Sequence, residues 1–127
     1  MMAEAYDLGK TGEELAVKHL VDKGYRIVER NWHSGHKEID IIAQKDDALV
    51  IVEVKTRKSD DFGEPDIAVG KDKQRMLIRA ADAYVRYKNL NMDVRFDIIS
   101  IVCTPGKPKI EHIEDAFTPG CTSFTWG

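Results

Sequence analysis

Two carboxylates and a lysine on neighbouring predicted strands are the residues of this chain best suited to chemistry. They are Asp40, which follows Glu38-Ile39, and Glu53 and Lys55 in the segment Glu53-Val54-Lys55. Two adjacent carboxylates repel each other, and a hard divalent cation that takes oxygen ligands, such as Mg²⁺ or Mn²⁺, removes that cost. A divalent cation held beside a lysine suits the hydrolysis of a phosphodiester bond.

A predicted hairpin brings the two acids side by side. Residues 38–44 and 48–56 have the pattern of strands, and Asp46-Asp47 between them is predicted to be a turn. Counting outward from this turn places Asp40 opposite Glu53. Since side chains alternate along a strand, Lys55 lies on the same face as Glu53. A Glu-x-Lys sequence on a strand is common by itself, so the matching acid at position 40 is what favours a functional site.

A candidate third acid, Glu13, lies on the first predicted helix. This helix is predicted to start at Thr11, which would form a capping box with Glu14, and to run to about Lys23. Glu13 falls on the same helical stripe as Leu20, so it is predicted to face the core. A carboxylate in an apolar stripe is costly unless it is paired or bound to a metal.

Three basic residues are candidates for contacts with phosphate groups, and one further acid lies beside the site. Lys73, near the start of a second predicted helix over 71–90, is either a lysine that reaches solvent or a phosphate contact near the acids. Arg57 and Lys58 leave the site in a basic cluster that could bind a nucleic-acid backbone. Glu38 is either a solvated residue at a strand end or a group that supports the metal ligands.

Other polar and aromatic residues are predicted to have structural roles. The basic residues on the opposite side of the second helix are interpreted as a solvated surface, and two histidines beside a turn are also interpreted as surface residues. Trp32 is assigned to core or interface packing rather than to stacking on a base. The basic residues of the helix are Lys71, Arg75, Arg79 and Arg86, and the two histidines are His33 and His36.

The periodic segments predict an α/β fold. Predicted strands over 25–32, 38–44, 48–56, 94–103 and 109–117 accompany the two helices. Both faces of the third strand are largely apolar, which is typical of a central strand that is covered on both sides. A chain of 127 residues favours a single domain, 1–127, with its core over 9–117 and a C-terminal tail over 118–127.

Composition limits how nucleic acid could be bound and where the protein works. The net charge is -3 and the isoelectric point is near 5.8, so no global positive field attracts nucleic acid. Binding would need a local basic patch, a bound cation or the groove of a dimer. Cys103 and Cys121 form no CxxC pair, and the N-terminus lacks the pattern of a signal peptide. We therefore expect a cytoplasmic protein with reduced cysteines and no membrane partner.

Several segments, taken together, resemble a known family. Residues 9–117 are similar to the bacterial YraN family, uncharacterised protein family UPF0102. That family resembles the restriction-endonuclease-like PD-(D/E)xK nucleases and, among them, the archaeal Holliday-junction resolvases. The segments that carry the resemblance are Gly9-x-x-Gly12-Glu13, Gly24-Tyr25-x-Ile27, Arg30-Asn31, Glu38-Ile39-Asp40-Ile41-Ile42-Ala43, Val52-Glu53-Val54-Lys55-x-Arg57 and Arg95-Phe96-Asp97.

The resemblance implies a restriction-endonuclease-like fold with a mixed central sheet of about five strands flanked by helices. It also implies Asp40 and Glu53 as metal ligands, Lys55 as the lysine of the motif and Glu13 as the helix acid. In the mechanism that we expect, the carbonyl of Val54 joins the two acids in holding Mg²⁺ or Mn²⁺.

Two classes of function follow from this reading. The first is a metal-dependent nuclease that hydrolyses DNA, with branched DNA as the implied substrate and RNA as an alternative. The second is a non-catalytic nucleic-acid-binding module on a nuclease-like fold, because fold does not fix function. A homodimer would supply two cuts to a branched duplex, and Phe117, Phe124 and Trp126 are the residues considered for its interface.

Overall fold

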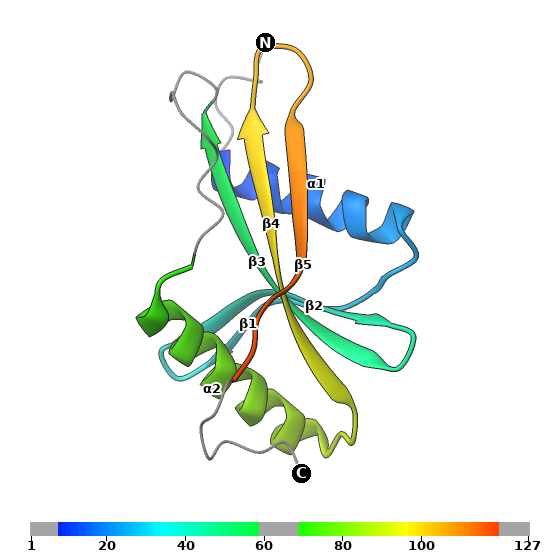
Figure 1. Cartoon of the computed structure of the whole chain (residues 1–127), viewed down its shortest axis with the longest axis vertical. Helices are drawn as coiled ribbons and strands as arrows, with labels where there is room; N and C mark the ends of the chain where they lie inside the picture. The colour runs from blue at the N-terminus through cyan, green and yellow to red at the C-terminus, as the bar shows by residue number, and fades with distance from the viewer. Residues whose placement is uncertain (1–7, 59–68, 120–127) are drawn as a thin grey trace.

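The computed structural model describes residues 8–58 and 69–119, and side chains from residue 11 onward. One sheet holds all five strands in chain order, β1-β2-β3-β4-β5 (Figure 1). β3 and β4 are parallel and the other neighbouring strands are antiparallel, so the predicted mixed sheet of about five strands flanked by helices is confirmed. The elements are α1 (Leu8–Asp22), β1 (Arg26–Ser34), β2 (Lys37–Lys45), β3 (Ala48–Lys58), α2 (Lys71–Lys88), β4 (Asp93–Cys103) and β5 (Lys109–Phe117).

The two helices cover opposite faces of the sheet. α1 buries Ala16 and Leu20 against the face that carries Val50 and Val52 of β3. α2 buries a stripe that includes Leu77 against the other face of the same strand. β3 is therefore covered on both sides, as its two apolar faces predicted. No helix in the described part of the chain is both long enough and apolar enough to cross a membrane.

α1 begins earlier than predicted, at Leu8 instead of Thr11. Thr11 therefore lies inside the helix, and the predicted capping box with Glu14 is wrong. Glycine has low helix propensity, but Gly12 lies within α1 where the helix approaches β3. A Cβ atom at Gly12 would lie only 2.0 Å from Oγ1 of Thr56. Close packing against the sheet stabilises a helical turn that local propensity disfavours.

β2 and β3 separate at one end of their shared hairpin, and this separation is called the fork. The two strands pair with the predicted register from Lys45↔Ala48 to Ile41↔Val52. Beyond that pair, β2 continues to pair with β1 as far as Ser34↔Lys37. β3 continues to pair with β4 as far as Lys58↔Cys103. Figure 1 shows the β1–β2 hairpin diverging from the part of the sheet formed by β3, β4 and β5.

The C-terminal aromatic residues bear on the homodimer prediction. Phe117, at the end of β5, stacks on Phe96 with ring centroids 5.0 Å apart. It packs against the core on the α2 side of the sheet, so it is not the exposed interface residue that the sequence suggested. Phe124 and Trp126, as well as most of the predicted loop over 58–69, lie outside the described residues.

Candidate active site

The structure brings Asp40 and Glu53 together at the fork. They occupy the first positions beyond the pair Ile41↔Val52, where the ladder between β2 and β3 has ended. In place of a ladder bond, the backbone N–H of Val54 donates to Oδ2 of Asp40 at 2.9 Å. The carboxyl group of Glu53 is close enough to Asp40 for the charge of Asp40 to act on it. The end of strand pairing thus turns two side chains of one hairpin toward the same point.

Burial raises the pKa values of both acids. Burial is the main cause of the raised pKa of Asp40, and the charges of Glu13 and Glu38 add to it. The pKa of Glu53 rises from 4.5 to about 7, first because of burial and then because of the neighbouring charge of Asp40. Only 13% of the Glu53 side chain is exposed. Near neutral pH Glu53 is therefore partly protonated, and a cation beside it would favour its ionised form.

Lys73 supplies a cation beside Glu53. Its Nζ atom, from the first turn of α2, lies 3.4 Å from Oε2 of Glu53. The ammonium lowers the pKa values of both Glu53 and Asp40, against the effect of burial. The Lys73 side chain is 47% exposed, so it contacts both the largely buried Glu53 and the solvent. Its predicted position beside the acids follows from the helical stripe that it shares with Leu77.

Lys55 lies two residues beyond Glu53 on β3, on the same face of the strand and half-buried. Arg57 and Lys58 complete the strand beyond it. The Arg57 side chain is half-buried and that of Lys58 is exposed. The loop that these residues were predicted to adjoin lies outside the described part of the chain.

Glu13 faces inward as predicted, and its carboxylate is paired with residues of β1. Its Oε1 atom accepts hydrogen bonds from Nδ2 of Asn31 at 3.0 Å and from a guanidinium nitrogen of Arg30 at 3.2 Å. Its charge helps to raise the pKa of Asp40. Within the described residues, no three His, Cys, Asp or Glu side chains are grouped so that they could hold a metal ion. The candidate centre is therefore the pair Asp40 and Glu53, with Glu13 nearby.

The remaining predicted residues lie around this centre. Oε1 of the exposed Glu38 is 3.7 Å from Nε2 of His33, which is also exposed. His36 is exposed at the turn between β1 and β2. Trp32 packs edge-on against Tyr84, with ring centroids 5.2 Å apart, which confirms the assignment of Trp32 to core packing.

A buried polar network on the α1 side of the sheet was not predicted as a network. At its centre is Asp97, which accepts bonds from Arg95 at 2.8 and 2.9 Å and from the backbone N–H of Asp115 at 3.0 Å. Nε2 of His112 lies 2.8 Å from Asp97, and Nδ1 of His112 lies 3.2 Å from Nε2 of His19. Burial alone would raise the pKa of Asp97, but these hydrogen bonds hold it below its usual value. The only signal in the sequence was the segment Arg95-Phe96-Asp97.

Comparison with known proteins gives one family. The family described as "Uncharacterised protein family UPF0102" matches residues 12–101. A UPF0102 protein of Phocaeicola vulgatus is 50% identical over 118 residues, which are 93% of this chain and 98% of that protein. A UPF0102 protein of Flavobacterium psychrophilum is 53% identical over 116 residues, which are 91% of this chain and 98% of that protein.

Among solved structures, the chain is similar to Hjc of Archaeoglobus fulgidus, described as a Holliday junction resolvase from an archaeal hyperthermophile. The TM-score is 0.46 and the sequence identity is 20%. The similarity covers 80% of this chain and 72% of the archaeal chain.

Proposed function

The chain belongs to uncharacterised protein family UPF0102, and we propose that it is a metal-dependent nuclease that hydrolyses phosphodiester bonds in DNA. The observation that carries this proposal is the pair of buried carboxyl groups at the fork. Burial raises the pKa values of both Asp40 and Glu53, and Nζ of Lys73 on α2 lies 3.4 Å from Glu53. Strongly shifted acids with a specific charged partner are typical of catalytic sites.

The donor atoms of this pair fit Mg²⁺ or Mn²⁺. Both groups are carboxylates, the hard oxygen ligands that these ions prefer. Mg²⁺ commonly binds through only one or two protein carboxylates and takes its other ligands from water and substrate phosphate. The pair Asp40 and Glu53 therefore suffices as the protein's side-chain ligands, and the carbonyl of Val54 is the proposed third protein ligand. A bound cation would supply positive charge at the phosphate and lower the pKa of a water molecule.

Each neighbouring residue has a proposed task in the reaction. Lys55, on the face of Glu53, would orient the attacking water or stabilise the negative charge that grows on the phosphate. Lys73 would move from Glu53 to a phosphate oxygen, because the acids no longer need its charge once a cation is held. Glu13 and Glu38 would act through Asp40, whose pKa both raise. Arg57 and Lys58 would contact the DNA backbone beyond the scissile phosphate.

The decisive experiment is a cleavage assay on branched, single-stranded and duplex DNA. The branched substrate is included because the family resembles the archaeal Holliday-junction resolvases. Each DNA is incubated with Mg²⁺, Mn²⁺ or EDTA and with wild-type protein, Asp40→Asn or Asp47→Asn. Asp47 is a matched control because it is an exposed acid in the turn of the same hairpin. We expect cleavage that requires metal, is lost in Asp40→Asn and is kept in Asp47→Asn.

The same assay separates the nuclease from the binding module. Cleavage by Asp40→Asn at the wild-type rate, or cleavage in EDTA, would refute the proposed site. Binding of DNA by the wild-type protein without cleavage under any metal condition would favour the non-catalytic module. Far-ultraviolet circular dichroism of each variant would show that the fold is kept.

A further inference from the structure

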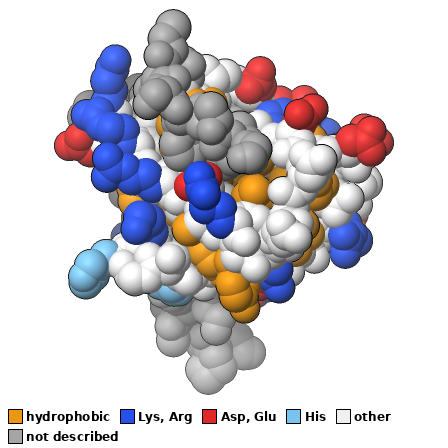
Figure 2. All heavy atoms as spheres, turned by 90° about the horizontal axis from the view of Figure 1, so that it is seen from below, with side chains coloured by type: hydrophobic (Ala, Val, Ile, Leu, Met, Phe, Trp, Pro, Cys, Tyr) orange, Lys and Arg blue, Asp and Glu red, His pale blue; other side chains and the backbone are white. Residues whose placement is uncertain are grey.

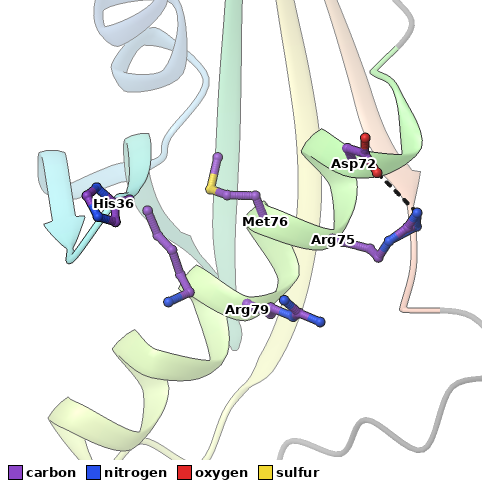
Figure 3. Close-up of a pocket in the computed structure, with 6 residues that line it drawn as sticks. His36, Asp72, Arg75, Met76 and Arg79 are labelled. Atoms are coloured by element: carbon purple, nitrogen blue, oxygen red, sulfur yellow. Dashed lines mark hydrogen bonds and ion pairs between the residues drawn. The ribbon is translucent and has the colours of Figure 1, made fainter.

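A groove lies beside the candidate active site and is called the α2 groove. It has a volume of about 380 Å³ and is formed between the β1–β2 turn and the N-terminal half of α2 (Figure 3). Its walls therefore come from two elements that are far apart in the sequence. The residues that line it are His36, Lys37, Asp72, Arg75, Met76 and Arg79.

The α2 groove is cationic although the whole chain is acidic. Its lining contains three basic residues, Lys37, Arg75 and Arg79, and one acidic residue, Asp72. The net charge of the whole chain is -3. Figure 2 shows Lys and Arg side chains gathered on the side where α2 begins, with a histidine beside them, while acidic side chains lie mainly on the opposite side. The positive potential is therefore local, which is what a selective contact with an anionic chain requires.

Among the described residues that line the α2 groove, Arg75 and Asp72 form an ion pair that is easily exchanged. A guanidinium nitrogen of Arg75 lies 3.2 Å from Oδ1 of Asp72, and both side chains are largely exposed. Such surface pairs contribute little to stability, so Arg75 can turn to a phosphate at small cost. Arg79, one turn further along α2, is exposed on the same side. The two arginines lie along the groove wall (Figure 3).

The two elements that line the α2 groove also carry residues of the candidate active site. Lys37 lies three residues before Asp40 on β2. Lys73, whose ammonium is 3.4 Å from Glu53, directly follows Asp72 on α2. A polymer whose scissile phosphate lies at the acids would therefore have further phosphates to contact the groove. A small phosphoester would have none.

We propose that the α2 groove binds the phosphodiester backbone of DNA next to the bond that is cleaved at the fork. This inference rests on the proposed nuclease function and revises the interpretation of Arg75 and Arg79 as merely solvated residues. The contacts are to phosphate and carry no sequence information. Met76, between the two arginines, supplies an apolar surface for sugar rings.

The test compares the double variant Arg75→Gln/Arg79→Gln with Arg86→Gln. Arg86 is a matched control because it is an exposed arginine of the same helix, is paired with Asp82 at 2.9 Å and does not line the groove. Binding of fluorescently labelled DNA is measured by anisotropy in EDTA over a series of KCl concentrations. Loss of two phosphate contacts should raise Kd roughly tenfold and reduce the slope of log Kd against log salt by about 2, and Arg86→Gln should match the wild type.

A second measurement tests the proposed groove independently of the proposed nuclease activity. Hydrolysis of bis(p-nitrophenyl) phosphate with Mn²⁺ reports on the acids, since this ester has no neighbouring phosphates to bind in the groove. We expect the double variant to keep the wild-type rate on this ester and to lose activity on DNA. The proposal for the groove would be overturned if the double variant had the same Kd and salt slope as Arg86→Gln, even if DNA is cleaved. It would also be overturned if the wild-type chain did not bind DNA. A lower slope without any cleavage would support the groove and refute the nuclease.

Discussion

Replacing Glu53 by glutamine should stabilise the metal-free protein at neutral and higher pH. The pKa of Glu53 is 4.5 when unperturbed and about 7 in the folded chain, chiefly because of burial and then of Asp40. A shift of this size costs the folded state about 3 kcal/mol once the group is ionised. Since the folded pKa is the higher one, the cost is absent below pH 4.5, where Glu53 is protonated in both states. The cost grows as the pH rises and is complete above about 7, so the folded state loses stability over this range. Glutamine removes the cost because it carries no charge.

Urea unfolding in EDTA, followed by tryptophan fluorescence, measures this effect. Trp32 packs on Tyr84 and therefore reports on the core beneath α2. At about pH 8 we expect Glu53→Gln to be more stable than the wild type by up to about 3 kcal/mol, and at about pH 5 the difference should be small. The matched control is Glu38→Gln, an exposed acid on the adjacent strand, which should change stability by less than about 0.5 kcal/mol at either pH.

The pH dependence is the part of the result that can refute the reasoning. A variant that is no more stable than the wild type at the higher pH would show that the ionised Glu53 carries no such cost. A gain of equal size at both pH values would show that packing, not charge, is responsible. Addition of Mg²⁺ should raise the stability of the wild type more than that of Glu53→Gln, because a ligand stabilises the form that binds it.

Three further predictions concern other parts of the fold. Lys73→Gln should raise the pKa of Glu53 above about 7, measured by carbon NMR titration of the carboxyl group, because the ammonium lowers that pKa; an unchanged value would contradict the ion pair. Gly12→Ala should destabilise the protein by about 1–3 kcal/mol in thermal unfolding, since the added methyl overlaps Thr56, and a neutral effect would mean that α1 can shift freely. Asp97→Asn should cost about 3 kcal/mol at neutral pH in urea unfolding, because Arg95 loses the negative charge with which it is paired. That loss should shrink as the pH falls below 3.8, since the folded pKa of Asp97 is the lower one, and a loss independent of pH would point to packing.

The part of the site that the sequence predicts is the part controlled by local geometry. The short turn at Asp46-Asp47 and the alternation on both sides of it set the register of the hairpin, and the register places Asp40 opposite Glu53. The helical repeat likewise places Lys73 on the core side of α2. These inferences need only the repeat of one element and the length of one turn.

The features that escape the sequence depend on contacts between distant segments. His19 and His112 lie far apart in the chain, so no spacing rule could join them to Asp97. Arg75 and Arg79 have the pattern of an exposed helix face, and only the neighbouring hairpin turn makes that face one wall of a groove. The start of α1 was missed because Thr11 and Glu14 have the pattern of a capping box, although Thr11 lies inside the helix.

The fork also gives the protein a mechanical property. Each of its two arms is stiffened by its own ladder, β1 with β2 and β3 with β4, so bending is expected to concentrate at the hinge pair Ile41 and Val52. Asp40 is carried by one arm and Glu53 by the other, so repulsion between their ionised forms would push the arms apart, and a cation held by both acids would draw them together. The arm that carries Asp40 also carries His36 and Lys37 of the α2 groove. A shorter distance between Asp40 and Glu53 would therefore change the width of the α2 groove. The charge and cation occupancy of the two acids would then affect how tightly the groove binds a polymer.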